Sequence, residues 1–249
     1  MIVAAHQPCF VPWLGYFHKI AGCDRFVVLD NVQYEKQNYQ NRNRFKLVNG
    51  IRWLTVPVGH QSSEEAIADK RISYEIDDWR RRLWLTIEQA YGKSPHFRRY
   101  APALRGVCER RWERLVELDL HLLDLCLEWL DIHTPRVLGS SLQLTQKKSA
   151  LIVELCQKTG ATTYLAGAGG SRSYLDVGLL ASHGIDVSWQ DFTHPQYPQL
   201  HPALGFQSHL SVLDLLFNCG PESRDVLLHP SQKRPSWTTP TAPLAEPIP

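Results

Sequence analysis

The chain has 249 residues, of which 43% are hydrophobic and 21% are charged, and its formal net charge at pH 7 is +2. These values are typical of a globular protein and exclude a disordered, collagenous or coiled-coil chain. The small net charge argues against general nucleic-acid binding, so any basic surface is expected to be local. The length suits one large domain, or one domain with a smaller insert.

The six cysteines are scattered and include no C-x-x-C pair, which argues against zinc-ribbon, thioredoxin-like and disulfide-framework proteins. The opening MIVAAHQP lacks the basic start and long apolar run of a signal peptide. No run of 18 apolar residues indicates a membrane span. We therefore expect a reduced, cytoplasmic protein with no metal site, no cofactor and no membrane span.

The first 60 residues alternate between strand and turn patterns. The segment RFVVL, residues 25–29, contains a continuous apolar run with β-branched side chains, as in a parallel strand buried on both faces. Strands are predicted at residues 2–5, 25–29 and 53–58, a helix of two turns at residues 14–21, and loops at residues 6–13 and 30–44.

The pattern becomes helical at residues 75–131, where apolar side chains recur three or four positions apart. Beyond this segment, strands are predicted at residues 136–138, 162–165 and 185–189, and helices at residues 147–159 and 211–218. This alternation indicates an α/β fold with a mainly parallel sheet flanked by helices. We expect residues 1–229 to form a single α/β domain with a helical insert at 75–131, and the proline-rich residues 230–249 to form an extended tail.

Doubly wound sheets bind ligands beyond the carboxyl ends of their strands, so the loops that follow predicted strands are candidate sites. Residues 6–13 form the densest of these loops in polar and aromatic side chains. Cys9 could be a thiolate nucleophile if an imidazole such as that of His6 lies nearby and acts as its base. Alternatively, Cys9 is a small buried hydrophobe, as free cysteines usually are.

A second group of polar residues follows the strand at residues 25–29. Asp30 would place a carboxylate where it can orient a hydroxyl or an amine. Asn41, Arg42 and Asn43 offer planar donors suited to phosphate or carboxylate. The alternative is a polar hairpin whose asparagines adopt turn conformations.

Two further loops follow strands in the last third of the chain. The glycines from Gly167 onward could let backbone N–H groups approach an anion, with Arg172 and Tyr174 close behind, although the pattern is neither G-x-G-x-x-G nor a P-loop. The loop at residues 190–201 contains His194, which is either a general base or a hydrogen-bonded structural histidine.

Ten Lys or Arg residues face only three acids between residues 80 and 114. Such a basic face could dock an acidic acyl or peptidyl carrier protein, whereas a solvated face with internal ion pairs is the alternative. The residues expected to dock the partner are Arg80, Arg81, Arg82, Arg110 and Arg111.

A series of motifs runs in order to about residue 220. The motifs are His6-Gln-Pro8, Pro12-Trp-x-Gly-Tyr-Phe-x-Lys19, Asp30-Asn-Val-Gln-Tyr34, Asn41-Arg-Asn43, Tyr164-Leu-x-Gly167, Tyr174-Leu-Asp176, His194-Pro-x-Tyr197 and Ser211-Val-Leu-Asp214. In these motifs the chain closely resembles the WbqC-like family. The resemblance implies a bacterial cytoplasmic protein of O-antigen, polysaccharide or natural-product biosynthesis. Members of that family often have Asn where this chain has Cys9.

Three functions are compatible with these patterns. The favoured one is a transferase that moves an acyl or aminoacyl group, for instance from a carrier-protein thioester, onto a small-molecule amine or amino sugar. The second is an ATP-dependent nucleotidyl transferase, because the first loop is also similar to the HxGH layout, with Trp13 and Tyr16 in place of both histidines. The third is a non-catalytic subunit that binds a glycan or nucleotide sugar.

The candidate site residues are assigned for the favoured transferase function. Cys9, His6, Asp30 and His194 are the catalytic candidates. The candidates for substrate binding are Gln7, Trp13, Tyr16, Tyr34, Asn41, Arg42, Asn43, Gly167, Arg172, Tyr174, Gln190 and Tyr197.

Overall fold

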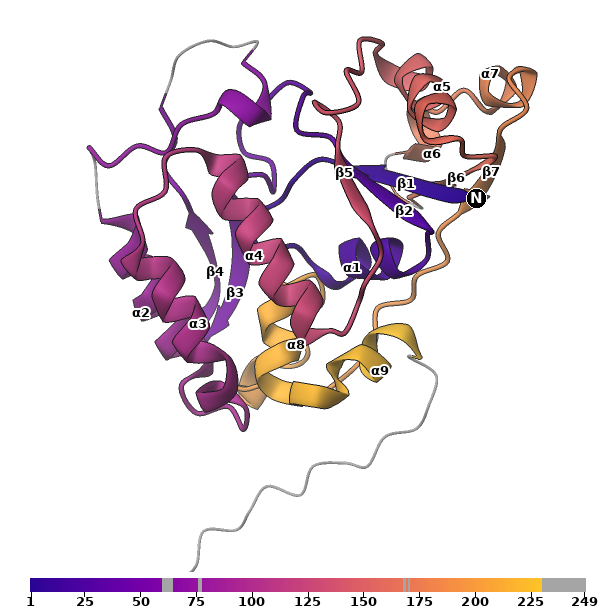
Figure 1. Ribbon diagram of the computed structural model, residues 1–249. Helices are drawn as coiled ribbons and strands as arrows, with labels where there is room; N and C mark the ends of the chain where they lie inside the picture. The colour runs from indigo at the N-terminus through magenta and orange to yellow at the C-terminus, as the bar shows by residue number, and fades with distance from the viewer. Residues whose placement is uncertain (60–64, 76–77, 168, 170, 230–249) are drawn as a thin grey trace, which may run out of the picture.

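The computed structural model describes residues 1–59, 65–75, 78–167, 169 and 171–229. Five parallel strands form its central sheet in the order β5-β2-β1-β6-β7 (Figure 1). The chain builds outward from β1 through β2 to β5, and then returns to the other side of β1. The crevice beyond the carboxyl ends of β1 and β6 is therefore the topological switch point, where such sheets bind ligands. The strands are β1 (Ile2–His6), β2 (Arg25–Val28), β5 (Arg136–Leu138), β6 (Thr163–Ala166) and β7 (Asp186–Trp189).

The strands β1 and β2, which are inner strands of the sheet, are buried on both faces, because their side chains alternate between two apolar cores. Val3, Ala5 and Val27 belong to one core, whereas Ala4 and Phe26 belong to the other. This double burial explains the continuous apolar run at residues 25–29. The predicted α/β class, with a mainly parallel sheet flanked by helices, is confirmed.

Helices cover both faces of the sheet. The core on the Val3 face is closed by α5 (Lys148–Thr159) and α7 (Val177–Ser182), with the short α6 (Ser171–Tyr174) nearby, and the other face is covered by α1 (Leu14–Ala21) (Figure 1). The helix α5 ends where Gly160 adopts a left-handed conformation with φ of 70°, a geometry that glycine adopts without steric cost.

The rest of the chain packs onto the α1 face and extends its core. A β-hairpin, three helices and two C-terminal helices share this core, in which the rings of Tyr91 and Phe217 stack 4.7 Å apart. The elements are β3 (Arg42–Leu47), β4 (Gly50–Thr55), α2 (Trp79–Tyr91), α3 (Phe97–Glu109), α4 (Leu115–Trp129), α8 (Val212–Cys219) and α9 (Ser223–Leu228), with 3-10 turns at Ile67–Asp69, Pro202–Leu204 and Gly220–Glu222. The single domain over residues 1–229 stays a prediction, and the expected tail at 230–249 lies outside the described residues.

The β3–β4 hairpin differs from the sequence prediction. A loop was expected up to residue 44 and a strand at residues 53–58, but β3 begins at Arg42, and β4 ends at Thr55, which pairs with Arg42. The two strands are joined by a tight turn at Val48-Asn49, after which Gly50 pairs with Leu47. Gly50 has φ of 119°, a conformation that glycine adopts without steric cost, and it fixes the register of both strands.

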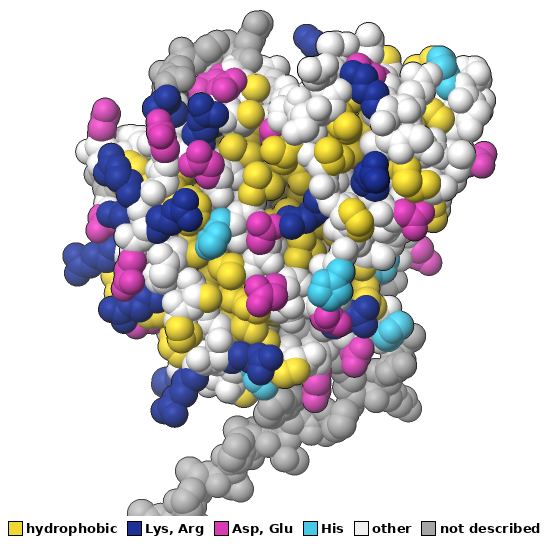
Figure 2. Space-filling view, viewed as in Figure 1, with side chains coloured by type: hydrophobic (Ala, Val, Ile, Leu, Met, Phe, Trp, Pro, Cys, Tyr) yellow, Lys and Arg dark blue, Asp and Glu magenta, His cyan; other side chains and the backbone are white. Residues whose placement is uncertain are grey.

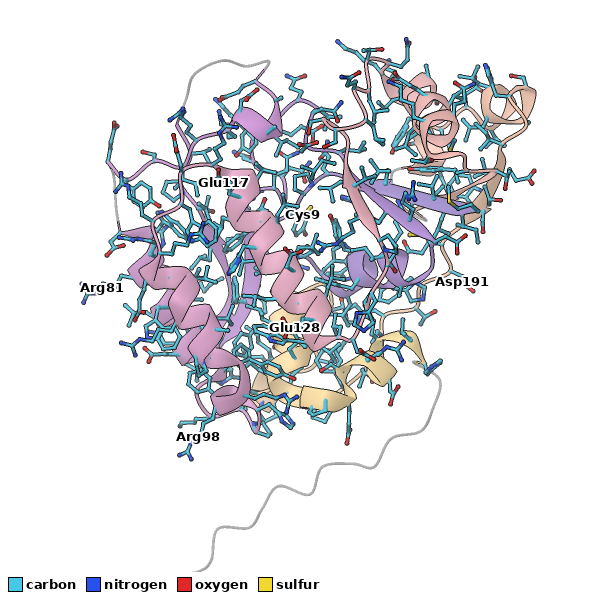
Figure 3. All side chains as sticks on the ribbon, in the orientation of Figure 1. Cys9, Arg81, Arg98, Glu117, Glu128 and Asp191 are labelled. Atoms are coloured by element: carbon cyan, nitrogen blue, oxygen red, sulfur yellow. The ribbon has the colours of Figure 1, made fainter. Side chains whose placement is uncertain are left out.

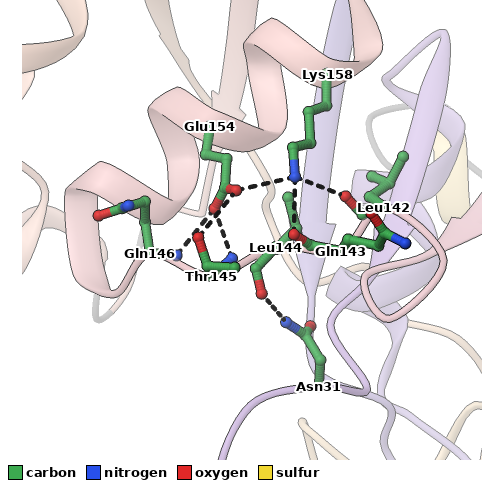
Figure 4. A network of polar contacts seen from close by, with 8 residues as sticks. All are labelled: Asn31, Leu142, Gln143, Leu144, Thr145, Gln146, Glu154 and Lys158. Atoms are coloured by element: carbon green, nitrogen blue, oxygen red, sulfur yellow. Dashed lines mark hydrogen bonds and ion pairs between the residues drawn. The ribbon is translucent and has the colours of Figure 1, made fainter.

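A polar network fixes the segment between β5 and α5 (Figure 4). The Glu154 carboxylate accepts hydrogen bonds from the backbone N–H groups of Gln146 (2.9 Å) and Thr145 (2.8 Å). It also pairs with Lys158 at 3.0 Å, and these contacts, led by the Gln146 N–H, lower the pKa of Glu154 to about 2. Asn31, just beyond β2, donates to the carbonyl of Leu144 in the same segment (3.2 Å). The network therefore ties the segment to the carboxyl edge of the sheet.

Within the described ranges, no helix combines the length and the apolar character needed to cross a membrane.

Candidate functional site

The end of the central strand β1 carries a compact group of ionisable side chains. The Nδ1 of His6 lies 3.0 Å from the carbonyl oxygen of Gln7, and the Sγ of Cys9 lies 3.9 Å from the same Nδ1. Because a carbonyl can only accept, Nδ1 carries the proton in this contact, and Nε2 is the basic nitrogen of the neutral ring. The hydroxyl of Tyr16 also donates to the Gln7 carbonyl (3.3 Å), and its ring packs edge-on against His6.

Burial sets the protonation of this group. Burial, with a smaller effect from Lys19, lowers the pKa of His6 to about 4, so the imidazole is neutral at pH 7. Burial also raises the pKa of the Cys9 thiol, and the nearby Asp119 raises it further. Figure 3 shows Cys9 in the interior beside α4. The geometry therefore presents an uncharged base next to a protonated thiol.

Two buried ionisable residues near this group were not identified from the sequence. Lys19, on α1, donates to the Ala5 carbonyl (2.9 Å), and burial lowers its pKa to about 8. Asp119, on α4, is 1% exposed, and neither of its carboxylate oxygens has a hydrogen-bond partner among the described residues. Burial raises the pKa of Asp119 well above its usual value. Its position four residues after Leu115, on the apolar face of the predicted helix, was the available signal.

Three of the predicted residues hold the loops around this group in place. Both carboxylate oxygens of Asp30 accept from Ser140, one from its backbone N–H (2.8 Å) and one from its hydroxyl (2.6 Å). The Asn43 amide donates to the carbonyl of Val11 (2.7 Å), which has an unfavourable φ of 38°. The Gln7 side chain accepts from the amide of the fully buried Gln40 (2.8 Å).

Tyr34, Asn41 and Arg42 line a cavity of about 330 Å³ beside the hairpin. The Asn41 amide donates to the Val56 carbonyl (2.8 Å), and the Arg42 guanidinium lies over the Trp53 ring at 4.4 Å. Burial raises the pKa of Tyr34 to about 12. The structure thus brings these three predicted residues together at one cavity.

The second predicted loop contacts the first through aromatic rings. Trp13 packs against Phe192 (5.4 Å) and stacks on His209 (5.0 Å). The Gln190 amide donates to the carbonyl of Gly15 (2.8 Å), so the start of α1 is joined to the segment after β7.

His194 and Tyr197, in the same loop, are engaged in structural contacts. The Nδ1 of His194 lies 2.9 Å from the carbonyl of Pro195, and its Nε2 accepts from the backbone N–H of His209 (3.2 Å). Both ring nitrogens of His194 are thus occupied by backbone groups. The Tyr197 hydroxyl donates to the buried Asp214 carboxylate (3.0 Å).

The remaining predicted substrate-binding residues lie near β6 and β7. Gly167 directly follows β6, beside the end of β1. The Arg172 guanidinium lies 4.9 Å from the Trp189 ring, and Tyr174 is 58% exposed. Of this group, only Gly167 is placed at the switch point by the strand order.

The predicted docking residues lie on one side of the molecule. Figure 2 shows Lys and Arg side chains gathered there, with acids among them, and Figure 3 shows Arg81 pointing away from α2. Several of these arginines also make contacts within the protein. Arg82 donates to the Thr55 carbonyl (2.8 Å), Arg110 lies 4.0 Å from the Trp112 ring, and the ring of Tyr74 is 4.1 Å from Arg111 and 5.4 Å from Arg80.

No three His, Cys, Asp or Glu side chains within the described ranges gather in a way that could hold a metal ion. All six cysteines lie within those ranges and are buried, and none forms a disulfide.

Comparison with known proteins places the chain in a family. No solved structure matches it. An uncharacterized protein, Rv1507c of Mycobacterium tuberculosis (strain ATCC 25618 / H37Rv), is 35% identical over 232 residues, which cover 90% of this chain and 96% of the relative. The sequence model of the WbqC-like protein family matches residues 7–226. The chain therefore belongs to the WbqC-like protein family, as the sequence motifs predicted.

Proposed function

We propose that the protein is a cytoplasmic biosynthetic transferase that moves an acyl or aminoacyl group from a thioester onto a small-molecule amine, such as an amino sugar. The observation that carries the proposal is the His6 imidazole at the end of β1. It is half-buried and neutral at pH 7, and its Nδ1 proton is held by the Gln7 carbonyl. An imidazole in this state offers Nε2 as a general base without first having to lose a proton.

In the proposed reaction, the nitrogen of the amine attacks the carbonyl carbon of the thioester. A C–N bond forms and the C–S bond breaks. Nε2 of His6 takes a proton from the attacking nitrogen and then returns it to the departing thiolate. The products are an amide and a free thiol, and the enzyme returns to its starting protonation state.

The surroundings of Cys9 support direct transfer over a covalent route through this residue. As a nucleophile, Cys9 would first have to lose its proton, but burial raises the pKa of its thiol. The nearest imidazole nitrogen, Nδ1 of His6, is the one that donates to Gln7. Both carboxylate oxygens of Asp30 accept hydrogen bonds from Ser140, so Asp30 would support the site by positioning the loop after β5.

The test is a screen of aminoacyl and acyl thioesters of N-acetylcysteamine with glucosamine as the acceptor, in which thiol release and amide formation are both followed. We expect His6→Gln to reduce the rate by about 10²–10⁴-fold, the usual contribution of a general base. The matched control is His133→Gln, because His133 is exposed and its ring pairs only with Asp131 among the described residues. Turnover that is equal in the His6 and His133 variants contradicts the proposal.

ATP-dependent nucleotidyl transfer is the second candidate, favoured by one observation. The strand order places Gly167, after β6, beside the end of β1 at the switch point of the sheet, where nucleotides bind in doubly wound folds. Trp13 caps α1 and Tyr16 lies in its first turn, so neither imidazole of the HxGH layout is present to stabilise a phosphoryl group. Release of pyrophosphate from ATP in the presence of an acceptor supports this candidate, and its absence with turnover of thioesters removes it.

A further inference from the structure

The cavity between residues 34–42 and the β3–β4 hairpin has the chemistry of an anion site. Three cationic residues, Lys36, Arg42 and Lys70, line it together with Tyr34 and Asn41. No Asp or Glu is part of its lining within the described residues. Its volume of about 330 Å³ is at the lower end of the range for ligand sites, about 300–1,000 Å³.

The charges around the cavity favour an anion with two negative charges. Lys70 is 2% exposed and its amine pairs with the carboxylate of Glu65 at 2.7 Å, so this buried cation already has one partner. The carboxylate of Glu35 does not line the cavity, and it accepts from the Asn38 amide (2.6 Å). Among the described residues, no ion pair joins Lys36 or Arg42 to a carboxylate. A phosphate monoester, which is largely dianionic at pH 7, matches them better than a carboxylate does.

Arg42 is held in a geometry suited to phosphate. Its guanidinium lies over Trp53 at 4.4 Å, and one of its terminal nitrogens donates to the Gln37 carbonyl. Its Nε has no acceptor among the described residues. A guanidinium whose plane is fixed in this way can donate two parallel hydrogen bonds to a phosphate group.

The cavity is also connected to the group around His6. The segment that lines it is hydrogen bonded to the first loop at two points, from Gln40 to the side chain of Gln7 (2.8 Å) and from the Phe10 N–H to the Tyr39 carbonyl (2.9 Å). The segment that lines the cavity is therefore tied directly to the loop that follows the proposed base.

We propose that this cavity binds the phosphate group of a small phosphate monoester, with Arg42 and Lys36 as its principal ligands and Lys70 as a buried supporting charge. The inference rests on the proposed function only in that the monoester is then a substrate, such as an amino-sugar phosphate. Binding is measured without turnover, so loss of the transferase proposal leaves this one testable.

The experiment is isothermal titration calorimetry with glucosamine 6-phosphate, inorganic phosphate, glucosamine and glucuronate as separate probes. We expect glucosamine 6-phosphate to bind at least tenfold more tightly than glucosamine and glucuronate, with inorganic phosphate also binding. Equal affinity for glucosamine 6-phosphate and glucuronate, or no binding of either phosphate, overturns the proposal.

Variants locate the binding. Arg42→Gln and Lys36→Gln should each weaken binding of glucosamine 6-phosphate at least fivefold, and Arg42→Lys should weaken it less than Arg42→Gln because the charge is kept. Lys36 is exposed, so its variant tests the site even if Arg42→Gln impairs folding. The control is Arg98→Gln, since Arg98 points away from α3 into solvent (Figure 3). Equal affinities in the Lys36 and Arg98 variants would place the phosphate elsewhere.

Discussion

The Sγ of Cys9 lies 3.9 Å from Nδ1 of His6, but that nitrogen faces the Gln7 carbonyl at 3.0 Å. The pair thus has the composition of a thiol–imidazole dyad without its proton arrangement, because the nitrogen nearest to the thiol already carries a proton. A catalytic dyad needs the thiolate form of the cysteine. Burial instead favours the protonated thiol of Cys9, because it raises the pKa of that thiol.

We predict that Cys9 reacts slowly with iodoacetamide in the native protein at pH 8, and that Cys9→Ala keeps its transferase rate within about threefold of wild type. The measurement is peptide mass mapping of alkylated Cys9 over time, with the urea-unfolded protein as the reference for full reactivity. A covalent acyl adduct on Cys9, found by intact-mass analysis during turnover, would instead establish the covalent route.

The pH dependence of turnover offers a separate check on His6. Its pKa of about 4 lies below the ordinary value of 6.5, so the base stays deprotonated in mildly acidic solution. We therefore predict that kcat/KM does not decline as the pH is lowered through 6.5. It would decline there if the base were a solvent-exposed histidine. A limb near pH 6.5 that disappears in His6→Gln would show that the base is protonated more easily than its burial implies.

Most of the sheet was predictable because its strands carry their own signal. Phe26, Val27 and Val28 of β2 are apolar in succession because both faces of the strand are covered, and the glycine that ends α5 adopts the left-handed conformation expected of it. The strand β3 was missed because its first three residues, Arg42 to Arg44, are all polar. Arg42 and Arg44 lie partly exposed on one side of that strand, whereas Asn43 is fully buried on the other.

The site was only partly predictable, for a physical reason. Sequence identifies polar side chains in loops after strands, and this located His6, Gln7 and Cys9. It does not reveal which polar side chains are already hydrogen bonded to the backbone, as Asn43 is to Val11, or which ionisable side chains lie inside the core, as Asp119 does. Those properties depend on contacts between residues that are far apart in the chain.

Gly15 and Trp13 form a testable packing unit at the start of α1. A Cβ atom built on Gly15 would lie 2.3 Å from the Trp13 indole, so Gly15→Ala must displace that ring from Phe192 and His209. We predict a loss of stability of about 1–3 kcal/mol, the usual range for overpacking. In a Trp13→Ala background the same change should stabilise the protein by up to about 1 kcal/mol, since alanine is the better helix former.

The four proteins of this double-mutant cycle are compared by urea unfolding. Strong non-additivity with a change of sign is the expected result. A stabilising effect of Gly15→Ala in both backgrounds would mean that the indole does not occupy the space above Gly15.

Asp214 should make the stability of the protein depend on pH. Its carboxylate is buried and accepts from Tyr197 and Gln199, and burial raises its pKa from 3.8 to about 6. Because the folded pKa lies above the unfolded one, the stabilisation is complete below about pH 3.8 and is lost as the pH rises through 6. Each pH unit between the two values corresponds to about 1.4 kcal/mol, so the effect is about 3 kcal/mol.

We predict that Asp214→Asn removes this contribution, so that its stability relative to wild type improves by about 3 kcal/mol between pH 3.5 and pH 7.5. Urea unfolding at both pH values gives the comparison, and Asp225→Asn, at an exposed position on α9, is the control. Parallel pH profiles for wild type and Asp214→Asn would show that Asp214 titrates at the same pH in both states.

The basic side of the molecule gives the last prediction, which concerns a protein partner. Arg81 is exposed and points away from α2 (Figure 3), and Arg111 is exposed and rests on Tyr74. If an acidic acyl carrier protein docks there, the double variant Arg81→Glu/Arg111→Glu should weaken its binding at least tenfold at low salt, because close like charges repel strongly across an interface. Stability should change by no more than about 0.5 kcal/mol per substitution, as is usual at exposed positions.

Lys147→Glu, a charge reversal at an exposed position at the start of α5, serves as the control. The measurement is titration with an acidic holo carrier protein at 20 mM and 200 mM salt. Because exposed charges are screened over about 8–10 Å at physiological ionic strength, genuine docking through this face should also weaken as salt rises. Wild-type affinity in the double variant, or an equal loss in the Lys147 variant, would show that the arginines serve only as a solvated face.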